Sequence, residues 1–189
     1  MAIISDAKNN QYICAINHNE ISKYFALDII LHDLNLEHKG SINIFRDPNN
    51  RLFLSSIYIY WNSRGLGLAT KLNNLANFVL KEEAGKIIRG RFHPYDNPQD
   101  LGLPQDLTKD EQVFFAEKFY KSNGYEILKL SDFEEHPERF PELDLWDFNF
   151  SSNPSEKIVI KKIPKLETYP FLEKDGIITE IEPEENLEK

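Results

Sequence analysis

One stretch of this sequence, from Leu52 to Leu72, changes its hydrophobic period from that of a strand to that of a helix. Its first half is apolar and rich in β-branched and aromatic residues, which is typical of a buried strand. Its second half begins a helix whose apolar positions fall on one stripe, at Leu68, Leu72, Leu75/Ala76 and Val79/Leu80. Gly65 and Gly67 stand between the two halves. The sequence therefore predicts a strand, a glycine-rich turn and a helix in immediate succession.

The predicted turn has the properties of an anion site. Gly65 and Gly67 carry no Cβ, so the N–H groups of the turn can point into one space at the helix N-terminus, where the helix dipole adds positive charge. The Walker pattern G-x-x-x-x-G-K-[ST] is absent, and the Rossmann pattern G-x-G-x-x-G fails at its third glycine, where Thr70 stands. A phosphate ligand is expected that neither common nucleotide loop explains. The alternative is that two glycines merely close a strand-to-helix turn.

A second pattern lies further along the chain. Thr108 and Glu111 have the spacing of a capping box, which predicts the start of an α-helix. The helix has an apolar stripe, ends at Gly124 and leads into a strand predicted over Glu126 to Leu130. The chain therefore predicts two successive α/β units, of which this helix and strand are the second.

Together, the two segments resemble the GNAT superfamily of acetyl-CoA-dependent N-acyltransferases. The turn Arg64-Gly65-Leu66-Gly67-Leu68-Ala69 is similar to that family's R/Q-x-x-G-x-G/A loop, and the second helix fills its A-x-x-x-Y-x-x-x-G-[FY] signature with Ala116, Tyr120, Gly124 and Tyr125. The resemblance covers residues 52 to about 130. It implies that acetyl-CoA is the cosubstrate, that the loop amides hold its pyrophosphate, and that the preceding strand carries a β-bulge and hydrogen-bonds the pantetheine arm.

The resemblance also assigns roles to single residues. Those expected to bind the cosubstrate are Ile57, Tyr58, Ile59, Arg64, Gly65, Leu66, Gly67, Leu68, Ala69 and Thr70. Tyr120 matches the family's general acid, whose hydroxyl protonates the departing thiolate, and a phenol with a pKa of about 10 suits that task. A core tyrosine on an apolar helix face is the alternative for Tyr120. The backbone amide of Ile59 is expected to stabilise the oxyanion.

The general base is less well defined. Family members often carry a glutamate on the strand before the loop, but this strand has only Ser55 and Ser56 among its central polar positions. His93, at the end of the next predicted strand, has a suitable pKa and is the candidate catalytic base, with a structural histidine as the alternative. Water relayed to a loop carboxylate such as Asp96, or an acceptor that arrives already neutral, remains open.

The rest of the chain predicts one domain of α+β (α/β) class, a single GNAT-like domain over residues 1–165. Strands are expected at residues 11–16, 24–31, 41–46, 87–92 and 157–163 in addition to those above, which gives a mixed central sheet of about six to seven strands. Only about seven residues separate Ile16 from Tyr24, too few for the two helices that the family places there, so reduced N-terminal helices are expected. In the family, those helices form one wall of the acceptor pocket. Here that wall is expected to be smaller, or to be supplied by another chain or by the long C-terminal segment.

Residues 166–189 are expected to form an acidic extended C-terminal tail, with a short extra strand at Gly176 to Thr179 as an option. Seven acids and two lysines lie between Glu173 and Lys189. Such a run is typical of a solvated tail, and an acidic arm that binds a partner is the alternative.

Composition excludes several classes of function. The net charge of −9 leaves no basic face for nucleic acid. Cys14 is the only cysteine and the five histidines show no short ligand spacing, so no metal is expected. No span approaches the ~20 apolar residues of a membrane helix, and the N-terminus lacks a signal-peptide core, which predicts no membrane partner and a cytoplasmic location.

The expected reaction is acetyl transfer from acetyl-CoA to the amine of a small molecule or peptide. Residues 96–106 and 132–147 carry many carboxylates and few bases, which favours a cationic acceptor, although a merely soluble surface explains them as well. Tyr95, Phe140 and Trp146 are candidates for cation–π contacts with it. A non-catalytic acyl-CoA-binding module and a nucleotide-binding protein are the alternative functions. A homodimer is an option for the assembly.

Overall fold

The structure, a computed structural model, describes residues 1–19, 26–92, 108–149 and 156–181. Its strands and α-helices follow in the order β1 (Ala2–Ser5), β2 (Gln11–His18), β3 (Leu27–His32), β4 (His38–Arg46), β5 (Leu52–Ile59), α1 (Leu68–Val79), β6 (Ile87–Arg91), α2 (Lys109–Ser122), β7 (Glu126–Lys129), α3 (Leu130–Glu135), α4 (Leu145–Asn149), β8 (Lys157–Lys162), β9 (Phe171–Lys174) and β10 (Ile177–Glu180).

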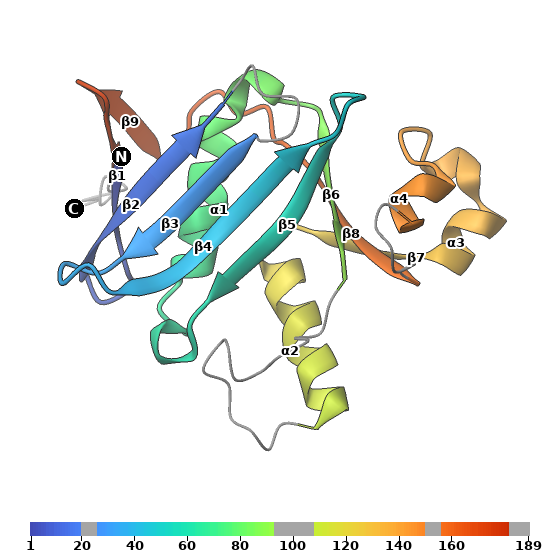
Figure 1. Cartoon of the computed structure of the whole chain (residues 1–189), viewed down its shortest axis with the longest axis horizontal. Helices are drawn as coiled ribbons and strands as arrows, with labels where there is room; N and C mark the ends of the chain where they lie inside the picture. The colour runs from blue at the N-terminus through green and yellow to red at the C-terminus, as the bar shows by residue number, and fades with distance from the viewer. Residues whose placement is uncertain (20–25, 93–107, 150–155, 182–189) are drawn as a thin grey trace, which may run out of the picture.

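All described strands join one ten-stranded sheet in the order β7-β8-β6-β5-β4-β3-β2-β1-β10-β9 (Figure 1). The pairs β5–β6 and β1–β10 are parallel, and the others are antiparallel. The mixed sheet with few helices confirms the predicted fold class. The sheet has more strands than expected because β1 and β9 were not predicted and β10 was only an option.

The sheet opens between β5 and β6. The two strands pair only through Leu52↔Ile88, Phe53↔Arg89 and Leu54↔Gly90, although β5 continues for five more residues to Ile59. Figure 1 shows the C-terminal part of β5 diverging from β6, with the C-terminal end of α2 at the gap. Beyond Leu54, no described strand pairs with this edge of β5.

A β-bulge bends β5 where the opening begins. Its register with β4 runs Asn43↔Ser56 and then Ile44↔Leu54, so Ser55 is one extra residue on β5. The extra residue changes which positions face the core, from Leu52 and Leu54 before the bulge to Ile57 and Ile59 after it. The bulge that the family resemblance implies is therefore present on this strand.

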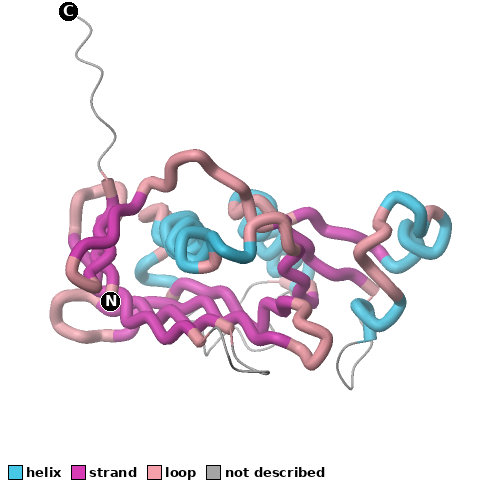
Figure 2. The backbone as a smooth tube through the Cα atoms, turned by 90° about the horizontal axis from the view of Figure 1, so that it is seen from above, coloured by secondary structure: helices cyan, strands magenta, loops and turns pink. Residues whose placement is uncertain are grey.

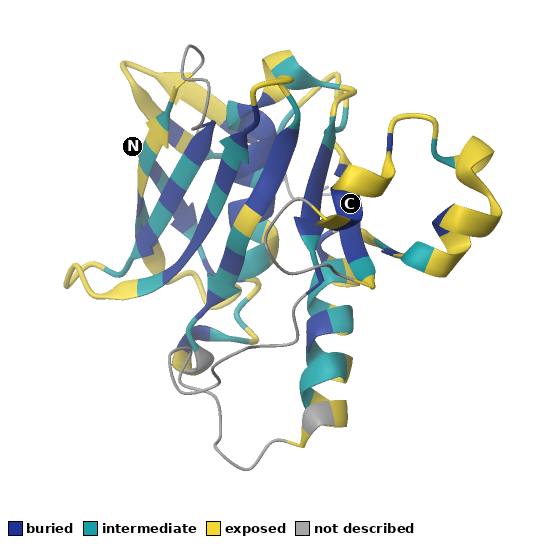
Figure 3. Ribbon diagram, turned by 45° about the vertical axis from the view of Figure 1, so that its right-hand side comes forward, coloured by how far each residue is buried: buried dark blue, intermediate teal, exposed yellow. Residues whose placement is uncertain are grey.

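Helix α1 covers one face of the sheet and supplies most of the helical contribution to the core. Leu68, Leu72 and Leu75 are buried on it, as the apolar stripe predicts, and pack with the inward residues of the strands. Figure 2 shows α1 on one side of the sheet, and Figure 3 shows buried positions alternating with more exposed ones along the strands. None of the described helices combines the length and the apolar character needed to cross a membrane.

Strands β2 and β3 follow each other with no room for two helices. The Asn19 amide donates to the Ala26 carbonyl at 3.2 Å, so Asn19 and Ala26 lie side by side. The six residues between them lie outside the described part. The prediction of reduced N-terminal helices is in agreement with this. Among the described residues, no helix stands between β2 and β3, where the family resemblance places two.

The segment expected to be an extended tail from residue 166 enters the sheet instead. Strands β9 and β10 form a hairpin, and β10 pairs in parallel with β1 through Ala2↔Ile178 and Ile3↔Thr179. Phe171 is buried and its ring lies 5.7 Å from that of Phe78 on α1. Phe171 of β9 and Ile178 of β10 are the buried apolar residues of this hairpin, and the high charge of the segment masks them in the sequence. Residues 182–189 lie outside the described part.

The segment after β7 forms two short helices, α3 and α4. It builds a second apolar cluster around Phe133, Leu143 and Phe148. Asp147 of this segment is fully buried, with its Oδ1 2.9 Å from Arg89 Nε of β6. Burial raises the pKa of Asp147 despite this cation, because loss of solvation outweighs the attraction of Arg89. This ion pair joins the second cluster to the sheet.

Candidate functional site

The turn after β5 has the backbone conformation that its glycines predict. Gly65 and Gly67 have φ values of 74° and 75°, in the left-handed region where a side chain is strained. A Cβ added at either position meets no atom within 4 Å. The glycines therefore serve the conformation of the turn and leave its outer side open, rather than making room for a neighbouring segment.

Three carbonyl groups of the turn are held by the protein, which fixes its shape. Arg64 donates from Nε to the Ile59 carbonyl at 2.8 Å, and the Ala7 amide donates to the Leu66 carbonyl at 3.1 Å. The Gly67 carbonyl accepts the first intrahelical bond of α1, from the Lys71 amide at 3.2 Å. Of these carbonyls, those of Leu66 and Gly67 lie next to the start of α1 and are occupied.

Helix α1 begins without a side-chain cap. Its N-cap residue is Gly67, no side chain accepts a hydrogen bond from the first turn, and no acid lies in that turn. The amides of Leu68, Ala69 and Thr70 precede the first intrahelical donor, so they remain available to a ligand. An anion placed there receives these donors and the positive end of the helix dipole.

A cavity of about 360 Å³ lies in front of this helix terminus. One side is the turn and the start of α1, and the other is the face of α2. The residues that line it are Ile59, Ser63, Arg64, Gly65, Gly67, Leu68, Ala69, Thr70, Phe115, Lys118, Phe119, Ser122 and Asn123. Lys118 brings a cation to the side opposite the helix terminus. The walls thus combine apolar side chains with positive charge, which suits an organic phosphate.

The free edge of β5 continues from this cavity into the opening of the sheet. Tyr60 donates from its amide to the Lys39 carbonyl at 3.0 Å, which fixes the alternation of hydrogen bonds with β4. By that alternation, the backbone groups of Tyr58 face β4, whereas those of Ile57 and Ile59 face the opening. The Ile59 carbonyl accepts from Arg64, so an extended ligand with amide groups can pair with the backbone groups of Ile57 and with the Ile59 amide.

Tyr120 lies on the β6 side of the same opening. Its ring contacts Phe92, just after β6, at 6.0 Å, and its half-buried side chain also contacts Phe119 and Tyr125. The capping box that positions α2 is present, with Thr108 Oγ1 accepting from the Glu111 amide.

A buried polar network, which sequence reasoning missed, supports the end of α2. Lys161 on β8 donates from Nζ to Asn73 Oδ1 at 2.7 Å, and Asn73 Nδ2 donates to the Asn123 carbonyl at 2.9 Å. The Lys161 ammonium also lies 5.3 Å from the centre of the Tyr125 ring. Burial lowers the pKa of Lys161 to about 8 and raises that of Tyr125. The sequence signal for this network was a polar residue on an otherwise apolar face, Asn73 on α1 and Lys161 on β8.

Of the candidate catalytic residues, Tyr120 is described, whereas His93 and Asp96 lie outside the described residues. On β5, Ser55 is exposed and Ser56 is half-buried. The Tyr58 side chain points to the open face of the sheet, where its ring contacts His38 at 5.8 Å. Burial raises the pKa of Tyr58, which disfavours its use as a phenolate base. No group of three or more metal-ligating side chains occurs within the described ranges.

The acidic segment proposed to attract a cation uses part of its charge internally. Asp144 and Asp147 pair with Arg51 at 3.0 and 3.7 Å, and the Arg51 guanidinium lies over the Trp146 ring at 4.5 Å. Phe140 packs against the second apolar cluster. Tyr95 and residues 96–106 lie outside the described residues.

Comparison with known proteins gave matches among solved structures only, since no family model and no curated protein matches the chain. A GNAT family acetyltransferase from Staphylococcus aureus is 18% identical, with 72% of this chain and 68% of that chain covered and a TM-score of 0.47. A GNAT family N-acetyltransferase from Escherichia coli, solved with CoA, is 12% identical over 83% and 68% of the two chains, with a TM-score of 0.43. The ribosomal-protein-S18-alanine N-acetyltransferase from Escherichia coli is 12% identical over 78% and 76%, with a TM-score of 0.42.

Proposed function

We propose that this chain is an acetyl-CoA-dependent N-acyltransferase of GNAT type. The observation that carries the proposal is the continuous path from the free edge of β5 through the glycine turn to the uncapped start of α1. A ligand that fits this path has an extended arm with amide groups joined to a phosphate. Coenzyme A has both parts in that order: its pantetheine amides suit the β5 edge, and its pyrophosphate suits the helix terminus.

The proposed reaction is direct attack of an amine on the acetyl thioester. A C–N bond forms, the C–S bond breaks, and the amine loses one proton to a base or to solvent. The Ile59 amide, which faces the opening, is the proposed donor to the oxyanion. The Tyr120 hydroxyl gives its proton to the departing thiolate and regains one from solvent. A contribution of His93 as the base remains part of the proposal.

A non-catalytic acyl-CoA-binding module is the second candidate, favoured by one observation. The part of β5 that borders the opening offers Ser55 and Ser56 but neither a carboxylate nor an imidazole. Serine alone is too weak a base to deprotonate an ammonium. Turnover of acetyl-CoA with a panel of amines separates the two candidates, because a binding module retains affinity without transfer.

The substitution Gly67→Asp tests the coenzyme site. Its carboxylate projects into the open space before α1 and repels a phosphate there, so we expect calorimetry to show no binding of coenzyme A. Gly176→Asp is the matched control, because Gly176 has the same φ of 75° and equally open surroundings, in the β9–β10 turn. Both variants should lose similar thermal stability, and only Gly67→Asp should lose binding. Unchanged affinity in Gly67→Asp would contradict the proposed site, and parallel titrations with NAD and ATP test for a nucleotide-binding protein.

A further inference from the structure

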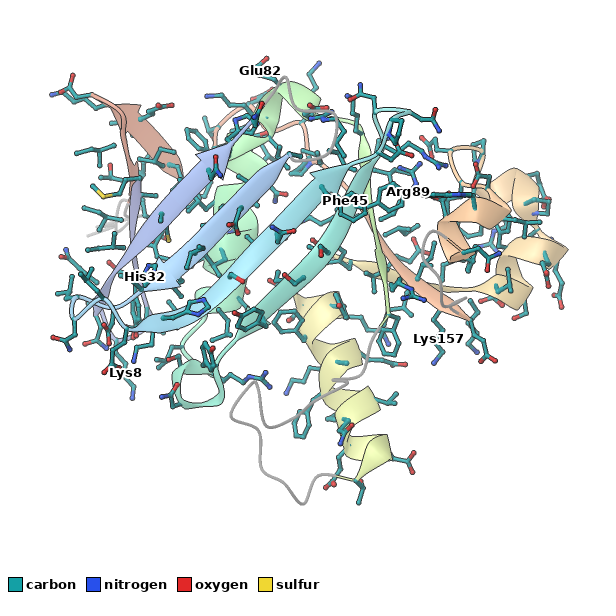
Figure 4. The ribbon with its side chains drawn as sticks, in the orientation of Figure 1. Lys8, His32, Phe45, Glu82, Arg89 and Lys157 are labelled. Carbon is teal, nitrogen blue, oxygen red and sulfur yellow. The ribbon has the colours of Figure 1, made fainter. Side chains whose placement is uncertain are left out.

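The face of the sheet opposite α1 carries a straight row of polar side chains. The register pairs Asp28 of β3 with Asn43 of β4, and Asn43 with Ser56 of β5. His32 and Phe45, at alternate positions on the same two strands, point to the viewer in Figure 4, whereas α1 lies behind the sheet. Asp28 and Asn43 share this orientation, since side chains of one strand alternate between faces. The row therefore crosses three strands and ends at the bulge on β5.

The polar groups of this row have no partners in the described protein. Asp28, Asn43 and Ser56 are half-buried, and no described residue forms a side-chain hydrogen bond or ion pair with any of them. By contrast, Asp33, at the end of β3, is paired with Lys39 at 3.1 Å. Burial raises the pKa of Tyr58, and the negative charge of Asp28 adds to this effect. The electrostatic field of the Asp28 carboxylate therefore reaches along this face to β5. A half-buried carboxylate without a partner is suited to an external cation.

Aromatic side chains border the row on both sides. On one side, the His38 ring lies 5.8 Å from Tyr58 and 5.2 Å from Tyr60. On the other, the Phe45 ring stacks on Phe53 at 5.2 Å. These surfaces can pack against a methylene chain laid along the row and can attract its cationic ends.

The position of the row relates it to the proposed reaction. Ser56 lies beside the opening between β5 and β6, where the thioester is proposed to lie. Asp28 is two strands away, which corresponds to about 10 Å at the spacing of hydrogen-bonded strands. A molecule that reaches from the thioester to Asp28 must therefore place a second positive group about 10 Å from its reacting amine.

We propose that the acceptor is a diamine or polyamine, whose distal ammonium pairs with Asp28 while its other amine attacks at the opening. This proposal rests on the proposed transferase function. The chemistry favours this class over amino acids, because a carboxylate of the acceptor would meet Asp28 with no cation in the row to offset the repulsion. Asn43 and Ser56 supply hydrogen bonds between the two ends.

The test compares amines that differ in the second charge and in length. Initial rates of acetyl-CoA consumption are measured with diaminooctane, diaminopropane and octylamine. We expect kcat/KM for diaminooctane to exceed that for octylamine by about 10-fold, as for one charge pair of moderate strength, and diaminopropane to show no such gain because it is too short to reach Asp28. In Asp28→Asn, the diaminooctane gain should vanish while the octylamine rate is retained.

Glu37→Gln is the matched control, since it also removes one carboxylate, from the turn next to His38 but outside the row. It should keep the preference for diaminooctane. Transfer to octylamine with no gain for diaminooctane, or a gain that survives in Asp28→Asn, would overturn the assignment of Asp28 and leave the transferase function standing. Absence of transfer to every amine would overturn both proposals.

Discussion

At the scale of single residues, Tyr120 carries the proposed proton transfer. In Tyr120→Phe, the ring keeps its contacts with Phe92 and Phe119, so only the hydroxyl is lost. We expect kcat to fall by about 10²-fold while the Kd for coenzyme A stays unchanged, as for the loss of a positioned acid. Tyr125→Phe is the control, because the buried Tyr125 hydroxyl has no hydrogen-bond partner among described atoms. Equal rates for Tyr120→Phe and the wild type would make Tyr120 a packing residue.

Lys161 gives the protein a pH-dependent stability. Burial lowers its pKa from 10.5 to about 8, so between these values the unfolded chain binds more protons than the folded one. The free energy of unfolding should therefore rise with pH across this window, by about 3 kcal/mol in total for this group. Urea unfolding of the wild type and Lys161→Met, from pH 7 to about 10, measures the difference.

Below pH 8 the lysine is protonated in both states, so its contribution is constant there. Lys162→Met is the control because Lys162 is the exposed neighbour on the same strand. A difference between wild type and Lys161→Met that does not change with pH would show that the ammonium is well solvated.

At the scale of elements, the β9–β10 hairpin contributes to stability through one buried ring. Phe171 is 4% exposed and contacts Phe78, whereas its neighbour Leu172 is 56% exposed. We expect Phe171→Ala to lower the free energy of unfolding by about 3 kcal/mol and Leu172→Ala by less than about 0.5 kcal/mol. Equal effects in denaturant unfolding would mean that the hairpin does not pack on α1.

Elements with strong local signals were predictable. The strand, turn and helix from Leu52 to Val79 have a change of period and two glycines, and α2 has a capping box, so both lie where expected. Strands β1 and β9 have four residues each, too few for an alternation to stand out. Their pairing also depends on residues far away in the sequence, which no local pattern reports.

At the scale of the whole molecule, the ion pair between Arg89 and Asp147 joins two apolar clusters. In Asp147→Ala, Arg89 keeps its buried charge without the carboxylate, and we expect a loss of about 3 kcal/mol or more in unfolding free energy. Asp144→Ala should cost about 1 kcal/mol, because Asp144 is more exposed and mainly caps α4. Similar losses for the two variants in urea titrations would mean that the buried pair is not the link between the clusters.

The site as a whole was only partly predictable. The motifs identified the glycine turn, which lies at the start of α1 beside a cavity, and Tyr120, which lies on α2 against Phe92 and Tyr125. The Ser55 bulge and the pairing with β4 decide which backbone groups of β5 face the opening between β5 and β6. The backbone groups of Tyr58 face β4, whereas those of Ile57 and Ile59 face the opening. The Asp28 row is assembled from three strands by their register, which sequence patterns do not specify.

The parallel pairing of β1 with β10 has a consequence for the order in which the protein is made. A ribosome synthesises β10 about 170 residues after β1, so the outer edge of β1 has no strand to pair with while the intervening residues are made. An unpaired edge is a template for association with other chains. The nascent chain is thus exposed to misassembly until the β9–β10 hairpin emerges and pairs with β1.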